Sequence, residues 1–379
     1  MRVLLLDYEY PPLARGAGAV SEALAHGLAS RGVRVDLVTL GERPSTESSL
    51  LGDGGSSQEG LLTVHRVKSR AGFLLAALRL LRLLLRGERY DLVHVFFSRP
   101  TGALLPLLNL GDLPVIISLQ AADNSRLGPF NRWIWRRADR LVAASESLGD
   151  QALRGWPSLR YSVVHNGVDL DCFHPARTIR RNRSGRVRCL AVAELTERER
   201  VADLIRALAL LERGRFELEI VGTGAEESRL RALVEGLGVA QEVVFRRPLS
   251  RAKVAERYRE ADLFTLAPSA DSTGGRFAEA LASALPIVGS SAGAIPEVVE
   301  HGNNGLLVRP GDVRAIADAI ARLADDPQLR REMGRRNRLQ AKATLDWSRI
   351  TERYLSIYAG VQRRRLAPAH PAEIPSSTW

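Results

Sequence analysis

Residues 268–296, PSADSTGGRFAEALASALPIVGSSAGAIP, decide the fold that we predict for this chain. An apolar strand ends at Pro268, and a glycine-rich loop, a helix and a second apolar strand follow it. The helix starts after Gly274 and Gly275. Such a turn directs unpaired backbone N–H groups and the positive end of a helix dipole at one point, which suits a phosphate group.

Two carboxylates, Asp271 and Glu279, flank this loop. Carboxylates repel phosphate, but they accept hydrogen bonds from the hydroxyl groups of a sugar. A phosphate site beside sugar-binding groups suggests a nucleotide sugar as the ligand. The stretch alone leaves open an alternative, an ordinary strand-to-helix turn with a capping Asp.

The composition is that of a globular protein with more than one domain. The chain has 379 residues, of which 45% are hydrophobic and 26% are charged, and this length is too great for one ordinary core. The formal net charge of +11 fits a polyanionic partner, an anionic membrane surface or phosphorylated substrates. Basic patches interleaved with aromatic residues are not evident, so we expect no nucleic-acid partner.

The two cysteines, Cys172 and Cys189, lie in unrelated contexts. They suggest neither a disulfide framework nor a zinc site, and we expect no bound metal. The first strand is too short for the core of a signal peptide, and no uncharged apolar run is long enough to span a membrane. We therefore expect a cytoplasmic protein.

Apolar strands alternate with helices along the chain, which predicts parallel, doubly wound α/β sheets. The expected first domain is 1–175, and the second is 187–346, after a polar and basic linker. Helix 347–364 is expected to pack back on the first domain, and the tail 365–379 is expected to be disordered. Residues 41–60, rich in Gly and Ser, predict a mobile loop. The expected strands are 2–7, 33–40, 62–67, 92–96, 115–119, 141–144, 187–193, 216–221, 242–245, 263–267, 286–289 and 305–308.

Two further glycine pairs lie between a strand and a helix: Gly16 with Gly18, and Gly222 with Gly224. Each pair either lets an anion approach a helix N-terminus or makes a tight connection. The first pair does not complete a dinucleotide-binding fingerprint, because Ser21 stands at the third glycine position.

Helix 73–86, FLLAALRLLRLLLR, places Arg79, Arg82 and Arg86 on one face. One interpretation is a core-packed helix with a solvated arginine stripe. The other is a peripheral membrane contact with anionic headgroups, which would suit a lipid-linked acceptor.

Several phrases together resemble glycosyltransferase family 4, the retaining nucleotide-sugar enzymes of GT-B fold. The resemblance covers roughly residues 1 to 360, and its phrases follow the order and spacing of that family. It implies a bacterial-type enzyme with two Rossmann-like domains facing a cleft. The phrases are 8–13 (YEYPPL) with Gly16 and Gly18, 166–171 (NGVDLD), 221–224 (VGTG), 261–264 (ADLF), 268–269 (PS), 279–282 (EALA) and 293–297 (GAIPE).

The resemblance also implies roles for single residues. Glu279 would hold the nucleotide ribose, and Asp271 would contact the donor sugar, where the family has a longer Glu. Asp123 is the second candidate catalytic residue. His94 and Gln120 are candidates on the acceptor side, although a structural role for His94 stays open. The remaining donor-binding candidates are Gly16, Gly18, Arg198, Arg200, Gly222, Gly224, Leu249, Gly274, Gly275, Arg276 and Phe277.

Two departures from the family concern the leaving diphosphate. Glu194 and Glu199 stand where the family has Arg and Lys, and a carboxylate repels diphosphate. Arg198 and Arg200 are candidate replacements if the loop shifts by one residue. Gln120 stands where a histidine is common, and an amide cannot act as a general base.

The resemblance therefore predicts a retaining transferase that moves a hexosyl group from a nucleotide sugar to an acceptor hydroxyl. It needs no cofactor or metal, since the nucleotide sugar is a substrate. A degenerate, non-catalytic GT-B protein that acts as a partner or regulatory subunit stays open as the alternative. So does another Rossmann-like enzyme, such as an epimerase of GT-B fold.

Overall fold

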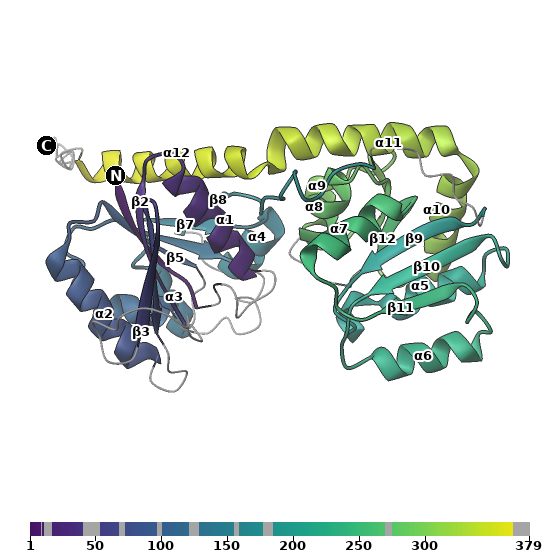
Figure 1. Cartoon of the computed structure of the whole chain (residues 1–379), viewed down its shortest axis with the longest axis horizontal. Coiled ribbons are helices and arrows are strands. Elements are labelled where there is room, and N and C mark those ends of the chain that lie inside the picture. Colours follow the sequence, from purple (N-terminus) through teal and green to yellow (C-terminus); the bar gives the residue numbers. More distant parts are fainter. Residues whose placement is uncertain are drawn as a thin grey trace, which may run out of the picture.

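The computed structural model of the chain forms two α/β domains that lie side by side along its long axis (Figure 1). It describes residues 1–8, 10, 17–40, 54–67, 73–96, 101–120, 129–154, 159–176, 185–269 and 275–366. Asp123, Asp271, Gly16 and Gly274 lie outside these ranges, as do most of the expected linker and residues 367–379 of the tail. No helix in the described part of the chain is long and apolar enough to cross a membrane.

The first sheet has eight strands in the order β3-β4-β2-β1-β5-β6-β7-β8. All neighbours pair in parallel except β3 and β4, which are antiparallel. The strands are β1 (Arg2–Leu6), β2 (Arg34–Leu40), β3 (Gly54–Glu59), β4 (Leu62–Val67), β5 (Leu92–Phe96), β6 (Val115–Leu119), β7 (Arg140–Ala143) and β8 (Tyr161–Val163).

Strand β3 corrects the prediction of a mobile loop over 41–60 for residues 54–59, while 41–53 lie outside the described ranges. Its sequence, GGSSQE, lacks the alternation of apolar and polar residues that predicts a strand. It nevertheless pairs with β4 from Gly54↔Val67 to Glu59↔Leu62. Pairing at the edge of a sheet rests on backbone hydrogen bonds, and these leave no mark in a side-chain pattern.

The second sheet has six parallel strands in the order β11-β10-β9-β12-β13-β14. The two sheets confirm the predicted doubly wound α/β fold. Among the parallel strands of each sheet, the order reverses at one place, between β1 and β5 in the first sheet and between β9 and β12 in the second. The strands are β9 (Val187–Val192), β10 (Phe216–Val221), β11 (Val243–Arg246), β12 (Leu263–Leu266), β13 (Ile287–Ser290) and β14 (Gly305–Val308).

Helices α10 and α11 begin at capping residues that the sequence supplies. Helix α10 starts after Asp312, whose side chain accepts a hydrogen bond from the Ala315 backbone, and α11 starts with Pro327 after the capping Asp326. The described helices are α1 (Ala17–Ala29), α2 (Phe73–Gly87), α3 (Pro129–Trp135), α4 (Glu146–Leu153), α5 (Val201–Ala209), α6 (Glu227–Gly236), α7 (Arg251–Glu260), α8 (Gly275–Ala282), α9 (Ile295–Val298), α10 (Val313–Asp325), α11 (Pro327–Gln340) and α12 (Trp347–Leu366), with the short turns η1 (Thr101–Leu107), η3 (Glu197–Glu199) and η4 (Ala341–Leu345).

The first sheet is covered on both faces, as the alternation along β1 shows. Val3 and Leu5 belong to the apolar cluster that contains residues of α1 and α12. Leu4 and Leu6 belong to the opposite cluster, with residues of α2 and η1. Side chains of successive strand residues point to opposite faces, so a continuous apolar strand requires helices on both sides.

The C-terminal helices connect the two domains. Helix α11, the turn η4 and helix α12 run in sequence along one side of both domains, and α12 lies on the first (Figure 1). The Val168 backbone N–H donates to the Leu345 carbonyl at 2.8 Å, so the two segments that cross between the domains are joined. Trp347 packs against Gly167, where an added Cβ would lie 2.6 Å from the indole ring.

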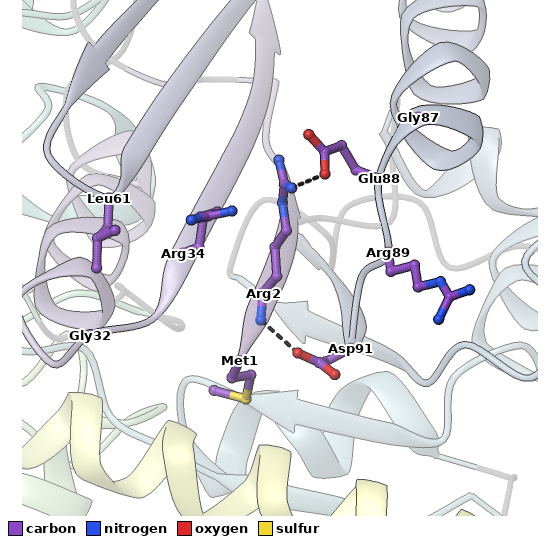
Figure 2. Close-up of a pocket in the computed structure, with 9 residues that line it drawn as sticks. All are labelled: Met1, Arg2, Gly32, Arg34, Leu61, Gly87, Glu88, Arg89 and Asp91. Carbon is purple, nitrogen blue, oxygen red and sulfur yellow. Dashed lines mark hydrogen bonds and ion pairs between the residues drawn. The ribbon is translucent and has the colours of Figure 1, made fainter.

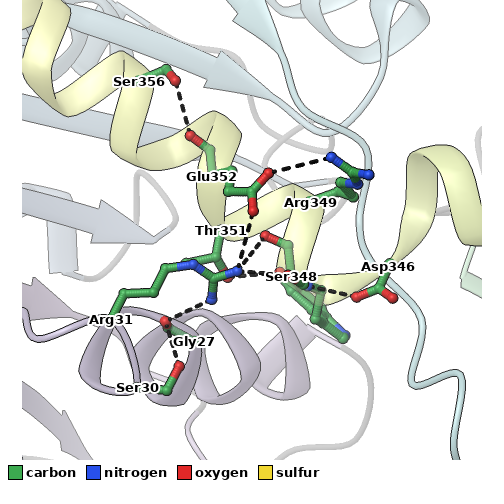
Figure 3. A network of polar contacts seen from close by, with 10 residues as sticks. Gly27, Ser30, Arg31, Asp346, Ser348, Arg349, Thr351, Glu352 and Ser356 are labelled. Atoms are coloured by element: carbon green, nitrogen blue, oxygen red, sulfur yellow. Dashed lines mark hydrogen bonds and ion pairs between the residues drawn. The ribbon is translucent and has the colours of Figure 1, made fainter.

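Helix α12 approaches α1 closely at Gly27. A Cβ there would lie 2.3 Å from Oγ1 of Thr351. Beside this contact, the Arg31 guanidinium donates to the Ser348 carbonyl at 2.9 Å and to its hydroxyl at 2.6 Å, and lies 3.6 Å from Glu352 (Figure 3). The glycine provides the close approach, and the arginine fixes its register.

We expect Gly27→Val to lower the free energy of unfolding by roughly 2–3 kcal/mol, because its side chain would overlap the buried Thr351. Denaturant unfolding measures the change. Gly360→Val on α12 is the matched control, since a Cβ there meets nothing within 4 Å. Equal losses in the two variants would show that helix propensity, and not the α1–α12 contact, governs the cost.

Candidate active site

The candidate site lies at the carboxyl ends of the second sheet, where the strand order reverses. The loop after β9 carries η3, and the segment after the neighbouring strand β12 leads into α8. Ligands of open parallel sheets bind at such a reversal point. The described residues that meet there are Glu199 of η3, Tyr258 of α7, and Arg276 and Glu279 of α8.

Helix α8 is held in place by an aromatic column in the core. Phe277 is fully buried and packs edge-on against Phe264, with the ring centroids 5.4 Å apart. Tyr258 also stacks on Phe264, with the ring centroids 5.6 Å apart, and its hydroxyl donates to the Arg276 carbonyl at 3.1 Å. Phe277 thus anchors the first turn of α8 to the core of the domain, and its side chain is a core residue.

Glu279 lies in this cluster as a largely enclosed carboxyl group. Burial raises its pKa to about 7, against the opposing effects of a hydrogen bond with Tyr258 and of the positive charges of Arg251 and Arg276. At neutral pH the group is therefore more protonated than an ordinary Glu would be. A ligand that donates hydrogen bonds to the carboxylate would favour the ionised form.

Glu199 and Arg276 form an ion pair at the edge of the cluster. Nη1 of Arg276 lies 2.8 Å from the Glu199 carboxylate, whose side chain is 3% exposed, while the Arg276 side chain is 30% exposed. Sequence reasoning placed Glu199 at a diphosphate-binding position and Arg276 in the glycine loop, but it did not pair them. The other acid in question, Glu194, is exposed.

The two arginines expected as replacements differ in their contacts. Arg200 donates from Nε to Asp203 at 2.6 Å, and its backbone adopts a left-handed conformation with φ 53°. The Arg198 carbonyl accepts hydrogen bonds from the Ser269 backbone at 2.9 Å and from its hydroxyl at 3.1 Å, so it ties η3 to the end of β12. The Arg198 side chain is exposed.

Gly222 and Gly224 allow two loops to pack together at the same edge. A Cβ on Gly222 would lie 1.8 Å from the Ala193 carbonyl oxygen, and one on Gly224 would lie 2.2 Å from that of Leu195. The Leu195 N–H donates to the Thr223 carbonyl at 2.9 Å. Among the other expected donor-side residues, Leu249 is partly buried against the core, and Gly275 is the first residue of α8, where an added Cβ would meet no atom of the described residues within 4 Å.

In the first domain, Gly18 is buried in the first turn of α1, where its carbonyl accepts from the Ser21 hydroxyl at 3.0 Å. Gln120 follows β6 and is 2% exposed. It pairs with Asn166, whose amide nitrogen donates to Oε1 of Gln120 at 3.1 Å. Gln120 therefore contacts the segment that crosses between the domains.

Of the two interpretations left open for His94, the structural one fits its surroundings. His94 is the third residue of β5, has no exposed surface and bonds to the Tyr358 hydroxyl at 2.7 Å and the Ser118 hydroxyl at 2.8 Å. Burial lowers its pKa to about 3, which keeps the ring neutral. It is a structural histidine, because α12 covers β5 at this position.

Glu297 makes a contact between the domains that sequence reasoning missed. Its carboxylate accepts from the backbone N–H groups of Glu146 at 2.8 Å and of Ser147 at 2.9 Å, in the first turn of α4. A carboxylate at a helix N-terminus is favourable. Since α9 follows β13 and α4 follows β7, the carboxyl ends of both sheets face the same interdomain space.

A hollow of about 550 Å³ lies at the opposite edge of the first sheet (Figure 2). It lies at the amino ends of β1 and β2, and Arg2 there is paired with Glu88 and Asp36. This edge is not where parallel sheets bind their ligands. Within the described residues, no group of His, Cys, Asp and Glu could hold a metal ion.

We expect the stability of the protein to fall through Glu279 as pH rises. The folded pKa of about 7 exceeds the ordinary value of 4.5, so this contribution is complete below pH 4.5 and is lost as pH rises through 7. Between those limits wild type should lose roughly 2–3 kcal/mol that Glu279→Gln does not lose. Denaturant unfolding at several pH values measures it, with the exposed Glu256→Gln as the control; parallel curves for wild type and Glu279→Gln would contradict the expectation.

Two family models match this chain, and together they cover most of it. The model described as Glycosyltransferase Family 4 matches residues 14–172, and the one described as Glycosyl transferases group 1 matches residues 176–340. The first match includes the strands of the first sheet from β2 to β8, and the second includes all strands of the second sheet.

Relatives and solved structures extend the likeness over the whole chain. Glycogen synthase of Mycobacterium tuberculosis is 26% identical over 97% of this chain and 97% of its own length. Sucrose-phosphate synthase of Thermosynechococcus elongatus has a similar structure, with a TM-score of 0.81, 20% identity and coverage of 96% of this chain and 99% of that one. HepE of Anabaena, solved in complex with UDP-glucose, gives a TM-score of 0.74 at 18% identity over 95% of this chain and 100% of that one.

Proposed function

Because this chain belongs to the glycosyltransferases that join a family 4 domain to a group 1 domain, we propose that it is a retaining, nucleotide-sugar-dependent hexosyltransferase. Its donor is a nucleoside diphosphate sugar, and its acceptor is a hydroxyl group in glycan, glycolipid or polysaccharide biosynthesis. The enzyme needs no metal or other cofactor. HepE of Anabaena was solved with UDP-glucose bound, which supports a donor of this class.

The cluster around Glu279 is the observation that carries the proposal. An enclosed carboxyl group lies within the first helical turns after the strand-order reversal, together with the start of α8 and Arg276. The carboxylate suits the two hydroxyls of a ribose, and the helix N-terminus suits a diphosphate. A single ligand with both groups in sequence is a nucleoside diphosphate.

In the proposed reaction, the bond between the anomeric carbon and the diphosphate oxygen breaks, and the acceptor oxygen bonds to that carbon from the same face. The acceptor proton passes to the departing phosphate. Backbone N–H groups at the start of α8 and nearby arginines stabilise the charge that develops on the diphosphate. No protein nucleophile takes part, and the facing carboxyl edges of the two sheets position donor and acceptor.

We expect one of UDP, GDP or ADP to bind selectively in calorimetric titration. Glu279→Ala should weaken that binding about tenfold or more, because it removes an acceptor of two ribose hydrogen bonds. Glu256→Ala, an exposed change on the neighbouring helix α7, should leave the affinity unchanged. If the folded protein binds none of the three nucleotides, the proposed donor site is refuted.

A non-catalytic partner protein is the second candidate function, and the buried Glu199 favours it. A carboxylate beside the donor site opposes diphosphate binding unless a cation neutralises it, and Arg276 lies within 2.8 Å. Transfer from the nucleotide sugar whose nucleotide binds would decide against this candidate. Binding without transfer to any acceptor or to water would favour it.

We further propose that α2 lies on the inner face of an anionic membrane, where a lipid-linked acceptor would be available. Four leucines are exposed on α2 and the adjoining η1, and three arginines line the same helix, which has no acidic residue. Apolar side chains enter the lipid interface while arginines bind the headgroups. The residues are Leu74, Leu75, Leu83 and Leu107, with Arg79, Arg82 and Arg86.

We expect the protein to sediment with vesicles that contain anionic lipid and not with purely zwitterionic vesicles. Changing Arg79, Arg82 and Arg86 to Glu should weaken this binding by more than roughly tenfold. The matched control makes the same charge change on the second domain, at Arg314, Arg322 and Arg331, which are also exposed. Equal loss in both triple variants would indicate a general charge effect and contradict the membrane role of α2.

A further inference from the structure

The buried carboxylate of Glu199 is an unusual feature for an anion-binding site. Glu199 ends the short turn η3 after β9, and the whole residue is 2% exposed. A buried carboxylate is costly unless a cation pairs with it. Among the described residues, Arg276 is the one basic residue within ion-pair distance of it.

Arg276 connects this carboxylate to the start of α8. It is the second residue of the helix, and its carbonyl is held by the Tyr258 hydroxyl at 3.1 Å. One guanidinium nitrogen lies 2.8 Å from Glu199, and the side chain is still 30% exposed. A guanidinium carries five N–H donors, so this pairing leaves donors for a ligand at the helix N-terminus.

Two other arginines near the site have acidic partners of their own, while the Arg198 side chain is exposed on η3. Arg200 is bound to Asp203 at 2.6 Å. Arg251 lies 3.9 Å from Asp169 and over the Phe173 ring at 5.6 Å, which ties it to the segment that crosses between the domains. Arg276 is therefore the arginine that both lies at the start of α8 and keeps part of its surface toward solvent.

We propose that Arg276 is the cation that binds the donor's diphosphate in this chain, and that Glu199 is a positioning residue that holds its guanidinium there. The inference rests on the proposed donor site. It gives the acid at position 199 a function: the positive charge stands on α8, and the acid after β9 orients it. Glu199 and Arg276 then act as one unit, so neither substitution can be understood without the other.

Charge balance supports this arrangement. With Arg276 in place, the Glu199 carboxylate is neutralised and the N–H groups at the start of α8 face the ligand without a net negative charge beneath them. Without Arg276, the same carboxylate would repel a diphosphate. The planar guanidinium can also donate two parallel hydrogen bonds to two oxygen atoms of one phosphate group.

The test is calorimetric titration with UDP, GDP and ADP and with the corresponding nucleosides. In the variant Arg276→Gln, affinity for the nucleoside diphosphate that binds wild type should fall roughly tenfold to a hundredfold. Affinity for its nucleoside should stay unchanged, because the base and ribose contacts remain. Arg229→Gln, an exposed arginine paired with Glu226 on α6, is the control and should bind both ligands as wild type does.

Two double variants distinguish direct binding of the diphosphate by Arg276 from mere neutralisation of Glu199 by Arg276. Arg276→Gln with Glu199→Gln leaves no buried charge unpaired, so it should fold, and it should still bind the diphosphate weakly. Arg276→Gln with Glu199→Lys places a cation at the other end of the pair, and it should recover most of the lost diphosphate affinity. Thermal unfolding of each variant establishes that the folded proteins are being compared.

The outcomes distinguish this inference from the proposed function. If wild type binds none of the nucleotides, the donor site itself is refuted. If wild type binds a diphosphate and Arg276→Gln binds it equally well, the role of Arg276 is overturned while the donor site stands. Recovery of full affinity in the double glutamine variant would overturn it too, because Arg276 would then only neutralise Glu199.

Discussion

The packing of the C-terminal helix on the first domain is the constraint on which the rest of the structure depends. The chain crosses between the domains twice, and the hydrogen bond from Val168 to Leu345 joins the two crossings. Gly27 and Gly167 allow α12 and its first residue to approach the first domain closely. Because both crossings are fixed, the carboxyl ends of the two sheets face each other, and the Glu297 contact with α4 follows from that placement.

The candidate site combines charges that would be costly if they were separate. Glu199 is buried, Glu279 is partly buried, and Arg276 lies close to each. The arrangement keeps one carboxyl group paired and the other with a pKa of about 7. Such a site suits a ligand that has both hydroxyl donors and negative charge. The hydroxyls would donate hydrogen bonds to Glu279, and the negative charge would lie beside Arg276.

Much of the fold could be predicted from the sequence, because buried parallel strands leave continuous apolar runs. The strands with such runs, from β1 to β14, lie where they were expected within a residue or two. The polar edge strand β3 and the short β8 were missed, since neither has a run of that kind. The partners of His94 could not be predicted for a different reason: the helix that covers it comes from the C-terminal part of the chain, and the periodicity of a strand does not show which helix packs on it.

The sequence by itself determined the two-sheet architecture, the glycine-rich turns and the family of this protein, because these depend on local patterns and on ordered phrases. Only the tertiary structure decided which charges meet. The pairing of Glu199 with Arg276 and the capping of α4 by Glu297 join residues that are far apart in the chain. The order of strands in the sheet and the docking of one domain on the other bring these groups together in space. Neither produces a regular spacing of residues from which the contacts could be predicted.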